Sequence, residues 1–191
     1  MKTIKKEVTN EIIINKSKFI TIIIPFTTIE QIDDILKNIK NKYKDATHYC
    51  YGYVINGKEK MSDDGEPSGT AGMPILNVIK KNDLTNVICI VVRYFGGIKL
   101  GAGGLTRAYS NSAKEVIQKC KFGTLTKGYE IEIEFDYDKS KEIDYILKDI
   151  EISKTYDEKV KYKFNSYDEN IINKLKKYIK NIREITLIKD D

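Results

Sequence analysis

The chain has 191 residues, of which 41% are hydrophobic and 32% are charged. This length permits one large domain or two small ones, and the hydrophobic fraction is sufficient for a packed core. The longest apolar runs are far too short to cross a bilayer, and no apolar stretch follows the charges at the amino terminus. We therefore expect a cytoplasmic protein that makes no membrane contact.

The cysteine and histidine content limits the possible chemistry. Cys50, Cys89 and Cys120 lie far apart in the sequence, no pair has CxxC spacing, and the chain contains one histidine. A single histidine cannot build an ordinary zinc site, and a reducing compartment disfavours a structural disulfide. We expect no metal and no cofactor, and we expect Cys89 to be a small buried apolar residue.

The net charge of +5 is divided unevenly. Residues 1–125 carry 19 Lys and Arg against 12 Asp and Glu, whereas residues 126–191 carry 14 against 16. This difference places any contact with a polyanion on the first part of the chain. The alternative is a general bias toward lysine, which needs no binding partner.

The first 125 residues read as a mixture of strands and helices. Short β-branched runs alternate with apolar positions at the helical period, and Asn56-Gly57 is a strong turn signal. The expected elements are strands at residue 4, 12–14 and 19–24, a helix over 29–39, a strand over 48–55, a helix around 71–79, a strand over 84–93 and a helix over 104–120.

From about residue 122 to 127 the pattern restarts, which suggests a domain boundary. Apolar and acidic residues alternate over 129–137, as in a half-exposed strand. A helix over 139–149, a hairpin over 152–164, a helix over 168–180 and a strand over 185–188 follow. The order β-α-β-β-α-β is the ferredoxin-like signature. We therefore predict an α+β protein with domains at 1–125 and 126–191.

A glycine-rich stretch, GGIKLGAGG at residues 96–104, comes before the helix over 104–120. Glycines expose backbone N–H groups and allow positive φ, and a helix amino terminus favours an anion. Neither the Walker pattern nor the dinucleotide fingerprint is complete, and the glycines could instead permit close helix–sheet packing. The candidate anion-binding or nucleic-acid-binding residues are Arg93, Gly96, Gly97, Lys99, Gly101, Gly103, Gly104, Arg107, Asn111 and Lys114.

A second polar stretch contains Asp63, Asp64, Glu66 and Ser68. Three carboxylates within four positions could hold magnesium or act as a general acid and base. They could equally cap turns, because Asp and Ser accept backbone N–H bonds in such loops. No HxE, HExxH or nucleophile-elbow motif lies beside them, so we favour the capping interpretation, and no catalytic residue can be assigned.

The strand over 48–55 places His48 and Cys50 on one side and three tyrosines on the other. A Cys–His catalytic pair is conceivable, but a half-buried histidine beside a small apolar thiol is the simpler interpretation. Tyr49, Tyr51 and Tyr53 could offer stacking surfaces to bases, or they could be ordinary strand residues.

Three segments together resemble the IMPACT/YigZ family: ATHYCYGYV at 46–54, SDDGEPSGTAGMPIL at 62–76 and VVRYFGGIKLGAGGLTRAY at 91–109. The resemblance implies a first domain like the second domain of small-subunit ribosomal protein five and a second domain like domain V of elongation factor G. Gly52 stands where the family pattern has alanine. The resemblance also implies a regulator of translation that binds RNA, the ribosome or a protein partner.

Two rival functions stay open at this point. The ribosomal-type fold also carries sugar and mevalonate kinases, so the glycine-rich stretch could belong to a phosphate-binding enzyme, with Asp63, Asp64 or Glu66 binding metal or taking a proton. A protein–protein competitor without affinity for nucleic acid is the third possibility. Fold analogy does not decide between these alternatives.

Overall fold

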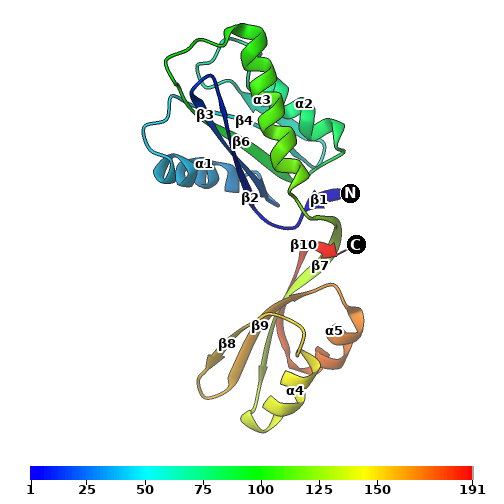
Figure 1. Cartoon of the computed structure of the whole chain (residues 1–191). Coiled ribbons are helices and arrows are strands. Elements are labelled where there is room, and N and C mark those ends of the chain that lie inside the picture. The colour runs from blue at the N-terminus through cyan, green and yellow to red at the C-terminus, as the bar shows by residue number, and fades with distance from the viewer. Residues whose placement is uncertain (191) are drawn as a thin grey trace. The chain divides into compact units, whose positions relative to one another are not determined.

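The computed structural model describes residues 1–190, which form two compact units, Met1–Thr124 and Leu125–Lys189 (Figure 1). Both are mixtures of helices and antiparallel sheet. No helix within the described residues is long and apolar enough to cross a membrane.

The first unit is built on a five-stranded antiparallel sheet with the strand order β2-β3-β6-β4-β5. A short strand, β1, pairs with the beginning of β7. The elements of this unit are β1 (Lys2–Ile4), β2 (Val8–Ile14), β3 (Ser17–Pro25), α1 (Gln31–Lys42), β4 (His48–Ile55), β5 (Lys58–Ser62), α2 (Gly72–Lys81), β6 (Val87–Tyr94) and α3 (Gly101–Gln118).

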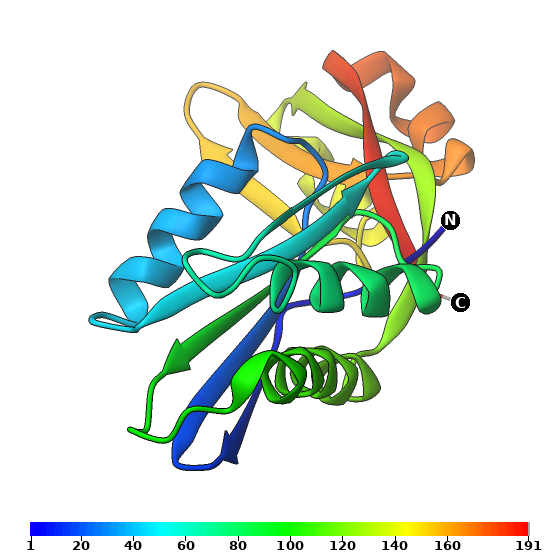
Figure 2. The same cartoon turned by 90° about the horizontal axis from the view of Figure 1, so that it is seen from above.

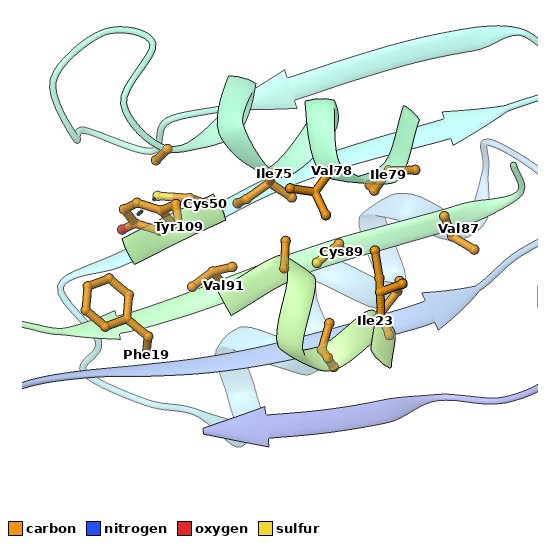
Figure 3. Close-up of a cluster of buried hydrophobic side chains, with 14 of the residues drawn as sticks. Phe19, Ile23, Cys50, Ile75, Val78, Ile79, Val87, Cys89, Val91 and Tyr109 are labelled. Atoms are coloured by element: carbon orange, nitrogen blue, oxygen red, sulfur yellow. Dashed lines mark hydrogen bonds between the residues drawn. The ribbon is translucent and has the colours of Figure 1, made fainter. Parts of the chain in front are cut away.

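Helices cover both faces of this sheet (Figures 1 and 2). Ile22, Ile88 and Ile90 face α1, whereas Ile23 and Val91 face α2 and α3 (Figure 3). Because successive side chains of a strand point to opposite faces, a strand buried on both sides becomes a continuous apolar run, as β6 is. Cys89 is fully buried within this strand, as the sequence predicts.

Gly52, the position where the family pattern has alanine, lies where α2 approaches β4 most closely. A Cβ atom built there would be 2.9 Å from the backbone nitrogen of Leu76 and 3.0 Å from its Cα. The glycine therefore allows α2 to pack directly on the strand.

The second unit contains a sheet with the strand order β10-β7-β9-β8. Its core joins apolar residues of these strands to Ile143 and Leu175 on the two helices. The elements are β7 (Phe122–Phe135), a 3-10 turn (Tyr137–Lys139), α4 (Ser140–Ile146), β8 (Ile152–Tyr156), β9 (Val160–Ser166), α5 (Glu169–Leu175), a second 3-10 turn (Lys176–Tyr178) and β10 (Ile179–Asp190).

Several predicted boundaries were wrong. The strand β5 was missed because its sequence, KEKMS, is polar and it pairs at the edge of the sheet. The helix expected from residue 104 begins at Gly101, so glycines assigned to a loop form its first turn. The helix expected over 168–180 ends at Leu175, and β10 begins at Ile179 instead of residue 185, because pairing with β7 outweighs the helix propensity of the lysines there.

Candidate nucleic-acid interface

Two segments that are far apart in sequence meet on the α3 side of the first unit: the β2–β3 turn and the segment that follows β6. The backbone N–H of Gly96 donates to Ser17 Oγ at 3.2 Å. A Cβ atom at Gly96 would lie 2.1 Å from the backbone C and O of Lys16. Gly96 therefore allows close packing of two backbone segments, a role that differs from the helix–sheet packing considered for the glycine-rich stretch.

The remaining glycines of this stretch face open space or begin the helix. Gly97 and Gly101 have φ angles of +86° and +73°, which favour glycine, and no heavy atom lies within 4 Å of a Cβ built at either position. Gly103 and Gly104 lie in the first turn of α3. The backbone of residues 97–101 is therefore unobstructed by side chains at two points, where a ligand could approach it closely.

Four predicted residues are polar and exposed, and we call them together the basic ridge: Lys99, Arg107, Asn111 and Lys114. The last three are spaced four and three residues apart on α3, so they share one face of the helix. Within residues 1–190, no ion pair or side-chain hydrogen bond involves any of the four. Their charges and amide are therefore available to a partner in solution.

Arg93 was grouped with these residues from the sequence, but the structure places it elsewhere. Its side chain is buried, at 4% exposure, and Nη1 lies 2.6 Å from Glu66 Oε1. Its guanidinium carbon lies 5.5 Å from the ring centroid of Phe19 and 5.4 Å from that of Phe95. Nη2 donates to Ser17 Oγ at 3.3 Å. Arg93 therefore holds β6 to Glu66 and Ser17 from inside the fold, and its charge is compensated.

Asp63 organises the polar loop between β5 and α2. Its carboxylate accepts backbone N–H bonds from Gly69 at 2.9 Å, Ala71 at 3.1 Å and Gly72 at 2.8 Å. Desolvation raises the pKa of Asp63, but these three hydrogen bonds outweigh it and hold that pKa below its usual value. The carboxylate thus holds the amino-terminal end of α2 to the loop, which is the capping role favoured from the sequence.

Asp64 and Glu66 of this loop also hold structure together, whereas Ser68 does not. Asp64 accepts a hydrogen bond from the backbone N–H of Tyr49, and its carbonyl oxygen lies 2.7 Å from His48 Nδ1. Glu66 is buried, and its Oε1 accepts a hydrogen bond from Tyr109 Oη at 2.7 Å in addition to its ion pair with Arg93. Ser68 is exposed, and within residues 1–190 its side chain forms no hydrogen bond.

His48 and Cys50 share one face of β4, but the geometry does not activate the thiol. Cys50 Sγ lies 3.0 Å from the carbonyl oxygen of Asp63 and 3.4 Å from Tyr109 Oη, as Figure 3 shows for the latter pair. Burial raises the pKa of Cys50 to about 12. His48 Nε2 instead points to Glu66 Oε2 at 3.6 Å. A thiolate nucleophile is therefore disfavoured at neutral pH.

Tyr49, Tyr51 and Tyr53 line the opposite face of β4 and pack against the cluster beneath α1. The rings of Tyr51 and Tyr53 stack with centroids 6.4 Å apart. Tyr53 belongs to the core, and Tyr49 and Tyr51 are half-buried against it, which agrees with the simpler interpretation of the sequence. Among the described residues, no group of three His, Cys, Asp or Glu side chains is placed to hold a metal ion.

Sequence reasoning missed three residues that shape the interface. Ser17 and Tyr109 complete the buried network around Arg93 and Glu66, and both read as ordinary strand or helix positions. Phe95 is 47% exposed, although it follows a buried strand. Its position next to two glycines was a signal that its ring is not covered by the helix that follows.

Comparisons with known proteins agree on the first part of the chain. The family model described as Impact N-terminal domain matches residues 15–117. The IMPACT family member YvyE of Bacillus subtilis is 47% identical over 116 residues, which cover 59% of this chain and 54% of that protein. YigZ of Escherichia coli is 31% identical over 139 residues, covering 70% and 68%. The chain thus matches about half the length of the first of these relatives.

One solved structure resembles the whole chain. A protein described as hypothetical covers 97% of this chain and 96% of its own, with a TM-score of 0.65 and 26% identity. The likeness extends beyond the region matched by the family model, so the second unit also has a counterpart of known structure.

Proposed function

Because the chain belongs to the IMPACT family, we propose that it regulates translation and that it does so by binding RNA, alone or within the ribosome, through the basic ridge. One observation carries the RNA contact: Lys99, Arg107 and Lys114 are exposed and have no ion-pair partner within residues 1–190, and Lys99 lies between Gly97 and Gly101, whose backbone is open. Phosphate contacts from such cations supply most of the affinity of RNA-binding surfaces.

The balance of charge supports the same choice of surface. Residues 1–125 carry 19 Lys and Arg against 12 Asp and Glu, whereas residues 126–191 carry 14 against 16. On the sheet of the second unit, Lys163 lies 3.3 Å from both Glu130 and Glu132, and Arg183 lies 2.9 Å from Glu130, so these cations must give up a carboxylate before they can bind a phosphate. We therefore place the RNA contact on the first unit.

The proposal includes the two finer fold assignments. The strand order β10-β7-β9-β8 and the helices between these strands support a ferredoxin-like second domain, residues 126–191. For residues 1–125 we propose the fold of the second domain of small-subunit ribosomal protein five. Both folds fit a protein that works with RNA, although fold analogy alone does not establish function.

The test is to measure RNA and nucleotide binding side by side, by fluorescence anisotropy at several salt concentrations. We expect RNA binding whose affinity falls steeply with salt, because counterions are released from the phosphates. Binding of ATP with magnesium and no binding of RNA would overturn the proposal in favour of the phosphate-binding enzyme. Salt-tolerant binding to a protein partner without affinity for RNA would favour the protein competitor.

A further inference from the structure

A hollow of about 260 Å³ opens between the β2–β3 turn and the first half of α3. Its floor is apolar, because Ala108 is buried and Ile14 and Leu100 are half-buried. Its rim is polar and exposed, and it consists of Asn15 from the turn and Arg107 and Asn111 from the helix. Gly104 also lines the hollow, and the absence of a side chain there lets Leu100 pack closely, since a Cβ atom would lie 3.0 Å from Leu100 Cβ.

The polar groups of the rim have unused hydrogen-bonding capacity. Within residues 1–190, no hydrogen bond or ion pair involves the side chain of Asn15, Arg107 or Asn111. Each amide offers one acceptor oxygen and two N–H donors, and the guanidinium offers five donors. The hollow of about 380 Å³ in the second unit differs, because Lys163 and Lys180 on its lining are paired with carboxylates.

We propose that this hollow binds an unpaired nucleobase of single-stranded RNA, a step that rests on the RNA contact proposed above. Pockets for drug-sized ligands have volumes of about 300–1,000 Å³, so this one suits a group the size of a single base. The apolar floor packs against the face of the base, and the amides of Asn15 and Asn111 bind the donors and acceptors on its edge. Arg107 contacts the adjoining phosphate.

Phe95 provides a second contact for the same strand. Its ring is exposed, and one face lies against the guanidinium of Arg93, which is itself fixed by Glu66. The ring is thereby held in place, so it offers a flat surface on which a neighbouring base can stack. A base within a duplex is already stacked and paired, so these contacts select single strands.

The experiment compares three fluorescent ligands of equal length: a single-stranded RNA, an abasic ribose-phosphate strand and an RNA duplex. We expect the single strand to bind about tenfold more tightly than the abasic strand, because the abasic strand lacks the base that fills the hollow. The double variant Asn15→Gly/Asn111→Ala should bind the single strand about tenfold more weakly and lose much less affinity for the abasic strand, because the cations Lys99, Arg107 and Lys114 remain. Glycine accepts the φ of 45° at position 15, and alanine suits the exposed helix position 111.

Equal affinity for the single and abasic strands, or unchanged binding of the single strand by the double variant, would overturn the base site while leaving the ridge contact intact. Duplex binding as tight as single-strand binding would do the same. Failure of all three ligands to bind would also overturn the proposed RNA contact through the basic ridge. The two proposals therefore fail in different ways.

Discussion

Glu66 and Arg93 form a buried ion pair, with 2.6 Å between Oε1 and Nη1, and the same carboxylate oxygen accepts the hydroxyl hydrogen of Tyr109. The pair joins the loop before α2 to the end of β6, immediately before the glycine-rich stretch. Tyr109 extends this network to α3, from which three of the four residues of the basic ridge project.

Breaking this pair should be costly. Glu66→Gln leaves a buried guanidinium without its counter-charge, so we expect the free energy of unfolding in urea to fall by about 3–5 kcal/mol. Arg93→Met should also destabilise the protein. The double variant Glu66→Gln/Arg93→Met should lose less free energy of unfolding than the two single variants lose together, because the residues interact directly. Additive losses would contradict a direct pair.

Two glycines of one segment should respond in opposite ways to alanine. Gly96→Ala places a methyl group against the backbone of Lys16, so the segment that follows β6 must move. We expect the free energy of unfolding to fall by about 1–3 kcal/mol and RNA binding to weaken. Gly103 lies in α3 with only the end of the flexible Arg107 side chain near its Cβ position, so Gly103→Ala should gain about 0.5–1 kcal/mol. Chemical denaturation of both variants checks the contrast, and a stable Gly96→Ala protein would contradict it.

Asp63 should make stability depend on pH in the acidic range. Its pKa is depressed in the folded state, so its contribution is fully present above the usual carboxyl pKa of about 3.9 and is lost as the pH falls through the folded value. At pH 7 we expect Asp63→Ala to lower the free energy of unfolding by about 1–2 kcal/mol, and the melting temperature with it. Below about pH 4 the difference in melting temperature between Asp63→Ala and wild type should shrink. A difference that is constant with pH would rule out this role for the carboxylate.

The thiols should react in the order of their exposure. Burial raises the pKa of Cys50 to about 12 and that of half-buried Cys120 to about 11, and it raises the pKa of Cys89 still further. At pH 8 only about one Cys50 thiol in ten thousand is a thiolate. Iodoacetamide should therefore label Cys120 first, and a Cys120→Ser variant should label slowly. Rapid alkylation of Cys50 in that variant would revive the Cys–His enzyme hypothesis.

The sequence predicted well where periodicity and burial coincide. The strand over 48–55 matches β4 at both ends, and β6 was found because an apolar run buried on both faces has few alternatives. The polar edge strand β5 left no such signal. In the glycine-rich stretch the residue types were informative, but their roles were not. Gly96 serves backbone packing and Arg93 is buried, because each of these two roles depends on a partner distant in sequence, and Gly101 begins the helix.

The central claim is that the basic ridge binds RNA, and charge reversal tests it most directly. The variant Lys99→Glu/Arg107→Glu should be compared with Lys37→Glu/Lys44→Glu, which changes the net charge equally at exposed positions in α1 and the loop that follows it. We predict that the ridge variant loses at least about tenfold in RNA affinity and that its salt slope falls by about 1.4, the value for two lost phosphate contacts, while the control stays close to wild type. Equal losses in both variants, or none in the ridge variant with the fold intact, would contradict the account.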